Sequence, residues 1–170
     1  MSQSAQQNTA LKNRYLTFEL ESEQYGVEIL RVKEIIGYQK ATHIPRTPTY
    51  VLGVLNLRGA IIPVIDLRSK LAMMTRLPDE QTAIIIAQLH QASIGFVVDR
   101  VNEVAAFKEE EIGQPPQLGT QVDTAFLSGV TQNEKRVVML LDLEQIFDTH
   151  EANQLQNLSQ ETKETTDAVA

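Results

Sequence analysis

Apolar and polar residues alternate with a period of two along much of the chain. Leu16 and Phe18 share one side of an extended segment and Thr17 lies on the other, which is the pattern of a half-buried strand. The same pattern predicts strands at Tyr15–Leu20, Tyr25–Ile29, Val51–Leu55, Ala60–Ile65, Ala83–Leu89, Ile94–Val98 and Val137–Leu141. Several of these runs are almost entirely Ile, Val and Leu, so we expect both of their faces to be covered. Pro63 cannot donate to a strand ladder, which predicts a sheet edge or a bulge at that position.

Two short helices are predicted where an aspartate precedes an apolar pattern. Asp66 can cap a helix that begins at Leu67, and Asp142 can cap one that begins at Leu143. The carboxylate of such a residue accepts hydrogen bonds from the free N–H groups of the first turn.

The two ends of the chain are polar. Residues 1–13 are rich in Ser, Gln, Asn and Ala, and the chain beyond His150 is mostly Gln, Asn, Glu and Thr with scattered leucines. Such segments bury too little apolar area to offset the entropy of ordering them. The sequence therefore predicts one domain at residues 14–150, between a disordered tail at 1–13 and a polar tail at 151–170 that extends the last helix by at most a few turns.

The two halves of the domain resemble each other. A shift of 69 residues places 15–35 on 84–104, and a shift of 76 residues places 53–67 on 129–143. The matches that apolar patterning does not explain are Gly26 with Gly95, Arg31 with Arg100, Glu34 with Glu103, Gly53 with Gly129 and Asp66 with Asp142. Each half then holds about five strands, which is enough to close a small barrel. We predict an all-β fold with a first barrel at about 14–72 and a second at about 81–148.

Composition narrows the class of protein. Hydrophobic residues make up 42% of the 170 residues, so a sizeable core can form, but no apolar run approaches the roughly 20 residues of a spanning helix. The absence of cysteine excludes disulfides, thiolate catalysis and cysteine-based zinc sites. The net charge of -7 argues against nucleic acids and anionic membranes as partners. A cytoplasmic location without membrane insertion is expected.

No pattern of reactive side chains indicates an enzyme. The histidines His43, His90 and His150 share no spacing typical of metal ligands. Ser128 lacks the preceding glycine of a nucleophile elbow, and the acidic run Glu109–Glu111 is typical of a solvated surface. No glycine-rich phosphate loop is present. We therefore predict a protein without catalytic residues, cofactor or metal.

One turn has an unusual composition for a link between two strands. Asn56-Leu57-Arg58-Gly59 carries an apolar residue and an arginine, whereas the equivalent turn Gln132–Lys135 is entirely polar. Arginine beside apolar side chains is typical of interface anchors, so Arg58 is a candidate binding residue. The segment Glu28–Ile36 is a second candidate, for which a core role and a binding role remain equally open.

Three segments carry a resemblance to a known family. Tyr25–Tyr38, Thr47-Pro48 and Gly53–Arg68 resemble the CheW-type chemotaxis coupling proteins, and the likeness runs from about Tyr15 to Phe147. It implies two Src-homology-3-like barrels of five strands around a shared core. It also implies an adaptor that couples the cytoplasmic tips of chemoreceptors to the regulatory domain of the histidine kinase CheA, within a multi-protein array. The residues that it implies are Val32, Glu34, Ile35 and Arg58 for the receptor, and Gly53 and Leu118 for the kinase.

Two alternatives stay open at this point. An adaptor of the same fold could serve another receptor–kinase pathway, such as surface sensing or pilus control. A barrel that binds single-stranded nucleic acid is a different class of protein, but it needs a basic groove and stacking aromatics. This chain has no tryptophan and only 5% aromatic residues, which disfavours that class.

Overall fold

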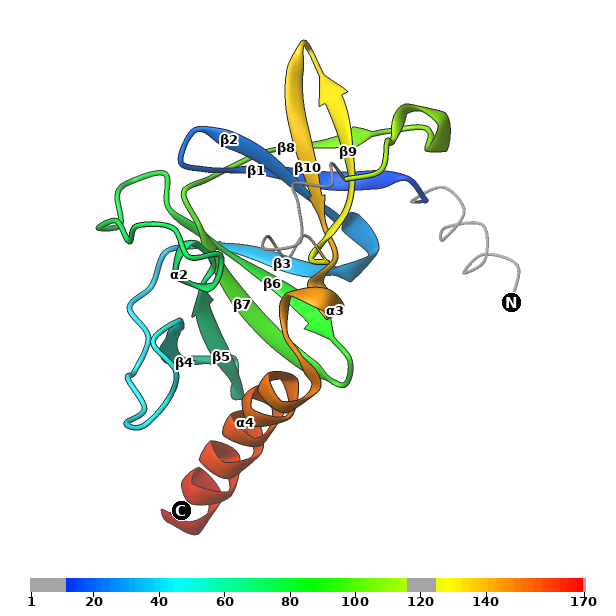
Figure 1. Ribbon diagram of the computed structural model, residues 1–170. Coiled ribbons are helices and arrows are strands. Elements are labelled where there is room, and N and C mark those ends of the chain that lie inside the picture. Colours follow the sequence, from blue (N-terminus) through cyan, green and yellow to red (C-terminus); the bar gives the residue numbers. More distant parts are fainter. Residues whose placement is uncertain (1–11, 116–124, 170) are drawn as a thin grey trace.

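The computed structural model describes residues 12–115 and 125–169, which form two five-stranded sheets, several short helical elements and one long helix (Figure 1). The strands are β1 (Arg14–Leu20), β2 (Glu23–Glu28), β3 (Val32–Gly37), β4 (Val51–Leu57), β5 (Ala60–Asp66), β6 (Ala83–Leu89), β7 (Ala92–Val98), β8 (Arg100–Ala106), β9 (Leu127–Asn133) and β10 (Arg136–Leu141). The helical elements are η1 (Ile29–Arg31), α2 (Leu67–Lys70), η2 (Glu109–Glu111), α3 (Leu143–Ile146) and α4 (Thr149–Val169).

The predicted strands and short helices are confirmed. Every predicted strand lies within or overlaps an observed one. Asp66 caps α2 by accepting a hydrogen bond from the backbone N of Arg68 at 3.2 Å, and Asp142 caps α3 through the N of Glu144 at 3.0 Å. Three observed strands, β3, β8 and β9, were not predicted. Each has several polar residues and a partly exposed face, so it lacks a long apolar run.

The internal duplication is confirmed, and it extends to every strand. Adding 69 residues maps β1, β2 and β3 onto β6, β7 and β8, and adding 76 maps β4, β5 and α2 onto β9, β10 and α3. Sheet A has the order β8-β1-β2-β10-β9, and sheet B has the order β3-β6-β7-β5-β4. The same mapping converts one order into the other, so the sheets are related by the duplication.

The predicted barrel boundaries at 14–72 and 81–148 are wrong. Sheet A combines β1 and β2 of the first half with β8, β9 and β10 of the second, and sheet B takes the remaining strands of both halves. The exchange depends on the pairing of β1 with β8 and of β3 with β6, which join residues far apart along the chain. Periodicity along the sequence carries no information about that pairing.

Pro63 lies opposite Val54 of the edge strand β4. The parallel pairing of β5 with β7 begins one residue later, at Val64. β5 is therefore not an edge strand along its length, but Pro63 occupies a position just outside the ladder on the β7 side, where its missing N–H group costs nothing.

A central core lies between the sheets and a smaller cluster lies against each of them. Phe18 of β1 and Phe96 of β7 are almost fully buried in the central core. Val64, Ile84 and Ile86 belong to the cluster of sheet B, and Tyr15, Phe107, Val138 and Leu140 to that of sheet A. β6 supplies Ile85 to the central core and Ile84 to the cluster of sheet B, which confirms that both of its faces are covered.

The C-terminal segment differs from the expected polar tail. α4 continues to Val169 and runs along β5 before projecting from the sheets (Figure 1). Leu155 is only 1% exposed in the central core, and Ala152 and Leu158 pack against it. A spacing of three residues places these side chains on one helical face, so the few apolar residues of the segment are enough to dock its first turns.

Candidate protein-binding surface

A tight hairpin between β4 and β5 presents Arg58. Its two central residues, Arg58 and Gly59, have φ angles of 51° and 88°, and positive φ at both positions is the type I′ geometry whose twist suits a two-residue hairpin. The Oδ1 atom of Asn56 accepts a hydrogen bond from the N of Gly59 at 2.9 Å. Asn and Gly therefore build the turn, while Arg58 bears the strain of the left-handed backbone.

The Arg58 guanidinium makes a two-pronged contact with Glu34 of β3. Nη1 donates to Oε1 at 3.0 Å, and Nη2 bonds Oε2. This hydrogen bond holds the pKa of Glu34 below its usual range. The contact connects the hairpin at one edge of sheet B with β3 at the other edge. Arg58 remains 74% exposed, so its guanidinium is held in place but stays accessible to a partner.

The predicted receptor residues lie close together, although they do not share one environment. Glu34 and Arg58 touch, and Ile35 is the next residue on β3 with 43% of its surface exposed. Val32 begins the same strand but packs partly against the central core, so this side chain has a structural role as well. The arrangement offers an exposed apolar side chain beside an oriented ion pair.

The structure describes only one of the two predicted kinase residues. Gly53 is buried with a φ of 141°, and a Cβ at this position would lie 2.0 Å from the carbonyl oxygen of Thr42. Close backbone packing therefore accounts for this glycine, and a kinase contact there stays a prediction. Leu118 lies outside the described residues.

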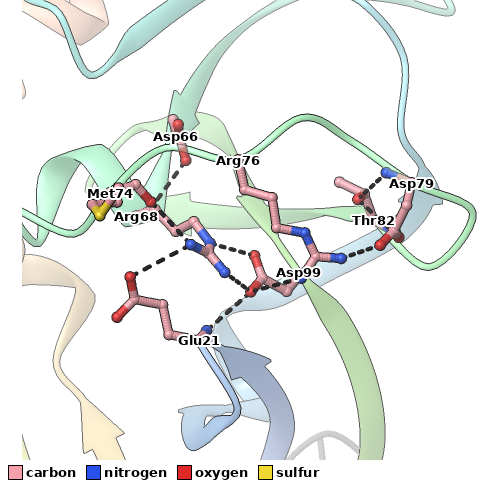
Figure 2. Close-up of polar contacts among 8 residues, drawn as sticks. All are labelled: Glu21, Asp66, Arg68, Met74, Arg76, Asp79, Thr82 and Asp99. Atoms are coloured by element: carbon pink, nitrogen blue, oxygen red, sulfur yellow. Dashed lines mark hydrogen bonds and ion pairs between the residues drawn. The ribbon is translucent and has the colours of Figure 1, made fainter.

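A second network of ion pairs, which the sequence did not reveal, joins the two sheets (Figure 2). Arg68 of α2 is buried, and its Nε donates to Oδ1 of Asp99 at 2.7 Å. Asp99 also accepts a hydrogen bond from the backbone N of Glu21, in the β1–β2 turn, at 2.9 Å. Burial raises the pKa of Asp99, but the hydrogen bonds from Arg68 and Glu21 outweigh it and the net shift is downward. The network is a structural connection rather than a reactive site.

Glu151 connects α4 to sheet B. Its Oε2 accepts hydrogen bonds from Nζ of Lys70 at 2.6 Å and from the hydroxyl of Tyr50 at 2.7 Å. Its Oε1 and backbone N exchange hydrogen bonds with the backbone N and side chain of Asp148, which form a cap at the start of the helix. Burial raises the pKa of Glu151, yet the bonds from Lys70 and Tyr50 lower it overall.

The described residues show no sign of metal chemistry or of a membrane span. Within 12–115 and 125–169, no three His, Cys, Asp or Glu side chains are grouped so that they could hold a metal ion. Among the same residues, no helix is both long and apolar enough to cross a bilayer.

Comparison with known proteins identifies the family. The model of the CheW-like domain matches residues 14–151, which include both sheets and the Arg58 hairpin. The chain belongs to the CheW-like family.

Relatives of the CheW-like chain match it over most of their length. The chemotaxis protein CheW of Klebsiella aerogenes is 37% identical over 145 residues, which are 85% of this chain and 87% of that protein. The probable chemotaxis protein CheW of Rhizobium etli is 34% identical over 81% of this chain and 88% of its own. The crystal structure of the scaffolding protein TtCheW from Thermoanaerobacter tengcongensis superposes with a TM-score of 0.74 at 34% identity, covering 82% of this chain and 94% of that one.

Proposed function

We propose that this protein is a non-enzymatic adaptor that couples the cytoplasmic tips of chemoreceptors to the histidine kinase CheA. Membership of the CheW-like family supports this role, as do relatives whose names assign them to chemotaxis. Neither a metal cluster among the described residues nor a reactive motif in the sequence suggests chemistry. We place the protein in the cytoplasm, at receptor arrays.

The observation that carries the receptor assignment is the accessible ion pair of Arg58 and Glu34 beside Ile35. Arginine is one of the residue types that contribute most to binding energy at protein interfaces, and Ile35 adds an exposed apolar side chain beside it. Glu34 fixes the guanidinium before binding, which lowers the entropy lost when a receptor helix docks. We assign Val32, Glu34, Ile35 and Arg58 to the receptor surface.

Coupling follows from differential binding. An adaptor that binds a receptor and a kinase better in one arrangement than in another shifts the pair toward that arrangement without making or breaking a bond. Single contacts near the micromolar range, about -8 kcal/mol, are sufficient, because several contacts in one array raise the effective concentration of each. The kinase surface includes Gly53 and Leu118 in this proposal.

Co-purification tests the proposal most directly. The full chain, a receptor fragment that contains the cytoplasmic hairpin tip and a CheA-type kinase are mixed in pairs and all together, then separated by size-exclusion chromatography. We expect binary complexes with each partner and a ternary complex. Binding to the kinase and to a receptor of another pathway, without binding to a chemoreceptor, would identify the alternative adaptor role. Failure to bind either partner would refute the proposal.

A further inference from the structure

α4 contacts the same hairpin that presents Arg58. The lining of one groove includes Arg58, Gly59 and Ala60 of the hairpin together with Gln156 and Ser159 of α4, and it also includes residues of the β6–β7 turn. Among the described elements, α4 makes its most extensive contacts with β5, the strand that follows the turn. The C-terminal segment, which the sequence predicted to be a polar tail, therefore forms a helix that borders the candidate receptor surface.

One hydrogen bond connects this helix to the hairpin. The Oγ of Ser159 donates to the carbonyl oxygen of Ile61 at 2.9 Å. Ile61 pairs with Asn56 across the hairpin, and the β5–β7 ladder begins only at Val64. In a two-residue hairpin the second pair after the turn directs its backbone groups away from the partner strand. Ser159 thus supplies a donor to a carbonyl beyond the end of the β7 ladder.

The N-terminal end of α4 is held in place by several side-chain contacts. Glu151 binds Lys70 and Tyr50 and closes the helix cap with Asp148. Nζ of Lys70 also lies 4.6 Å from the centre of the Tyr50 ring, a distance that allows a cation–π interaction. Leu155, one turn further along, is 1% exposed. A helix anchored at these points presents Ser159 to the hairpin in a defined place.

The second half of the molecule provides a natural comparison. Val137 of β10 is the counterpart of Ile61 by the 76-residue shift, and it pairs with Gln132 as Ile61 pairs with Asn56. Val137 is 48% exposed, whereas Ile61 is partly buried. The same hairpin geometry therefore occurs once with a helix against it and once with that strand position open.

We propose that α4 is a positioning element for the receptor surface: Leu155 docks the helix and Ser159 fixes the β4–β5 hairpin, so that Arg58 is held ready for the receptor. The expected effect on receptor affinity rests on the proposed receptor-binding function, whereas the ordering of the hairpin by α4 does not. Gly59 permits a wide range of backbone angles, and a fixed β5 restricts the directions in which the guanidinium can point.

Hydrogen exchange on the full chain tests the structural part. Ser159→Ala removes one hydrogen bond and leaves the helix propensity intact or improved. We expect amides of residues 57–62 to exchange about fivefold faster, the effect of one lost hydrogen bond, while amides of residues 133–138 keep their wild-type rates. Leu155→Ala should give a larger change at the first hairpin. Gln154→Ala, an exposed position on the same helix, is the matched control and should change neither hairpin.

Affinity for a receptor-tip fragment, measured by isothermal titration calorimetry, tests the consequence. Ser159→Ala should weaken binding about two- to fivefold, since a mobile hairpin loses more entropy on docking. Unchanged exchange at residues 57–62 in both variants would overturn the inference, and so would equal acceleration of both hairpins, which would indicate general loosening. If the wild-type chain binds no receptor fragment, the proposed function fails, and the exchange data still decide whether α4 orders the hairpin.

Discussion

The β4–β5 and β9–β10 hairpins occupy equivalent places in the two halves but differ in what they present. Both turns have positive φ at their two central residues, Arg58 and Gly59 in one and Glu134 and Lys135 in the other. Arg58 binds Glu34, whereas its counterpart Glu134 carries the same charge as the equivalent glutamate, Glu103, and cannot form that ion pair. That glutamate instead lies 3.5 Å from Nδ2 of Asn133.

The two hairpins share the same backbone geometry but differ in the chemistry of their surface residues. One hairpin has an oriented guanidinium and a helix against its strand; the other has Glu134 beside Lys135 at its turn and an exposed Val137. The fold requires the same turn geometry in both halves. Turn residues that differ between the halves are therefore not needed for that geometry and can serve binding. Four experiments test whether the two halves differ in this way.

Substitution of the equivalent glycines Gly53 and Gly129 should have the largest effect. Gly53→Ala forces a Cβ to within 2.0 Å of a backbone oxygen at a φ of 141°, so overpacking and backbone strain add to about 4 kcal/mol of lost stability. Gly129→Ala brings a Cβ to 2.5 Å from the Cγ2 methyl of Ile112 and 3.1 Å from the carbonyl oxygen of Gly113, without a positive φ, and we expect about 1–3 kcal/mol of lost stability. Urea unfolding measures both. Similar losses would show that the two positions have the same packing after all.

The ion pairs of α2 and α3 come next. Arg68 pairs with Asp99 in a buried network, whereas the pseudo-equivalent helix residue Glu144 pairs with Arg31 at 2.8 Å where both side chains are more than a third exposed. Asp99→Asn should cost about 3 kcal/mol, because the buried guanidinium loses the carboxylate that binds both its Nε and Nη2 and keeps only the Glu21 carboxylate at 3.5 Å. Glu144→Gln should cost about 0.2–1 kcal/mol. Urea unfolding at pH 7 is the measurement, and equal costs would contradict the distinction by burial.

Reversal of charge at the two turns tests the functional half of the comparison. Arg58→Glu should leave the melting temperature nearly unchanged and weaken receptor-tip binding by about 30-fold or abolish it, as expected for a hot spot of roughly 2 kcal/mol. Glu134→Arg is the matched control and should bind normally. Pulldown and thermal melting decide between outcomes: unchanged binding by the Arg58 variant removes that residue from the site, and a collapse of the fold would make it structural.

The smallest effect is the dependence of stability on pH. The pKa of Asp99 is lowered in the folded state from an ordinary value of 3.8, so this carboxylate stabilises the protein fully above about pH 4. Its contribution is lost as the pH falls through the lower folded value. Asp99→Asn should therefore show a weaker fall in stability between pH 6 and pH 3 than the wild type. Identical pH profiles by urea unfolding would show that Asp99 titrates as it does in the unfolded chain.

The sequence was informative where a signal is local. Alternation within Tyr15–Leu20 and the apolar run Ala83–Leu89 correctly predicted strands, and the Asp66 and Asp142 caps predicted both short helices. The unusual turn pointed to Arg58. The resemblance named Glu34 without showing that it touches Arg58, because Glu34 lies on β3 at one edge of the sheet and Arg58 lies in the turn that follows β4 at the other edge.

The sequence by itself determined the duplication, most of the strands and the exposed arginine turn, since each depends on residues near one another along the chain. Only the tertiary structure decided the exchange of strands between sheets, the Arg58–Glu34 contact, the buried Arg68–Asp99 pair and the docking of α4. Those features depend on contacts between distant segments. Periodicity specifies which face of a strand or helix is apolar, but it does not specify the surface against which that face packs.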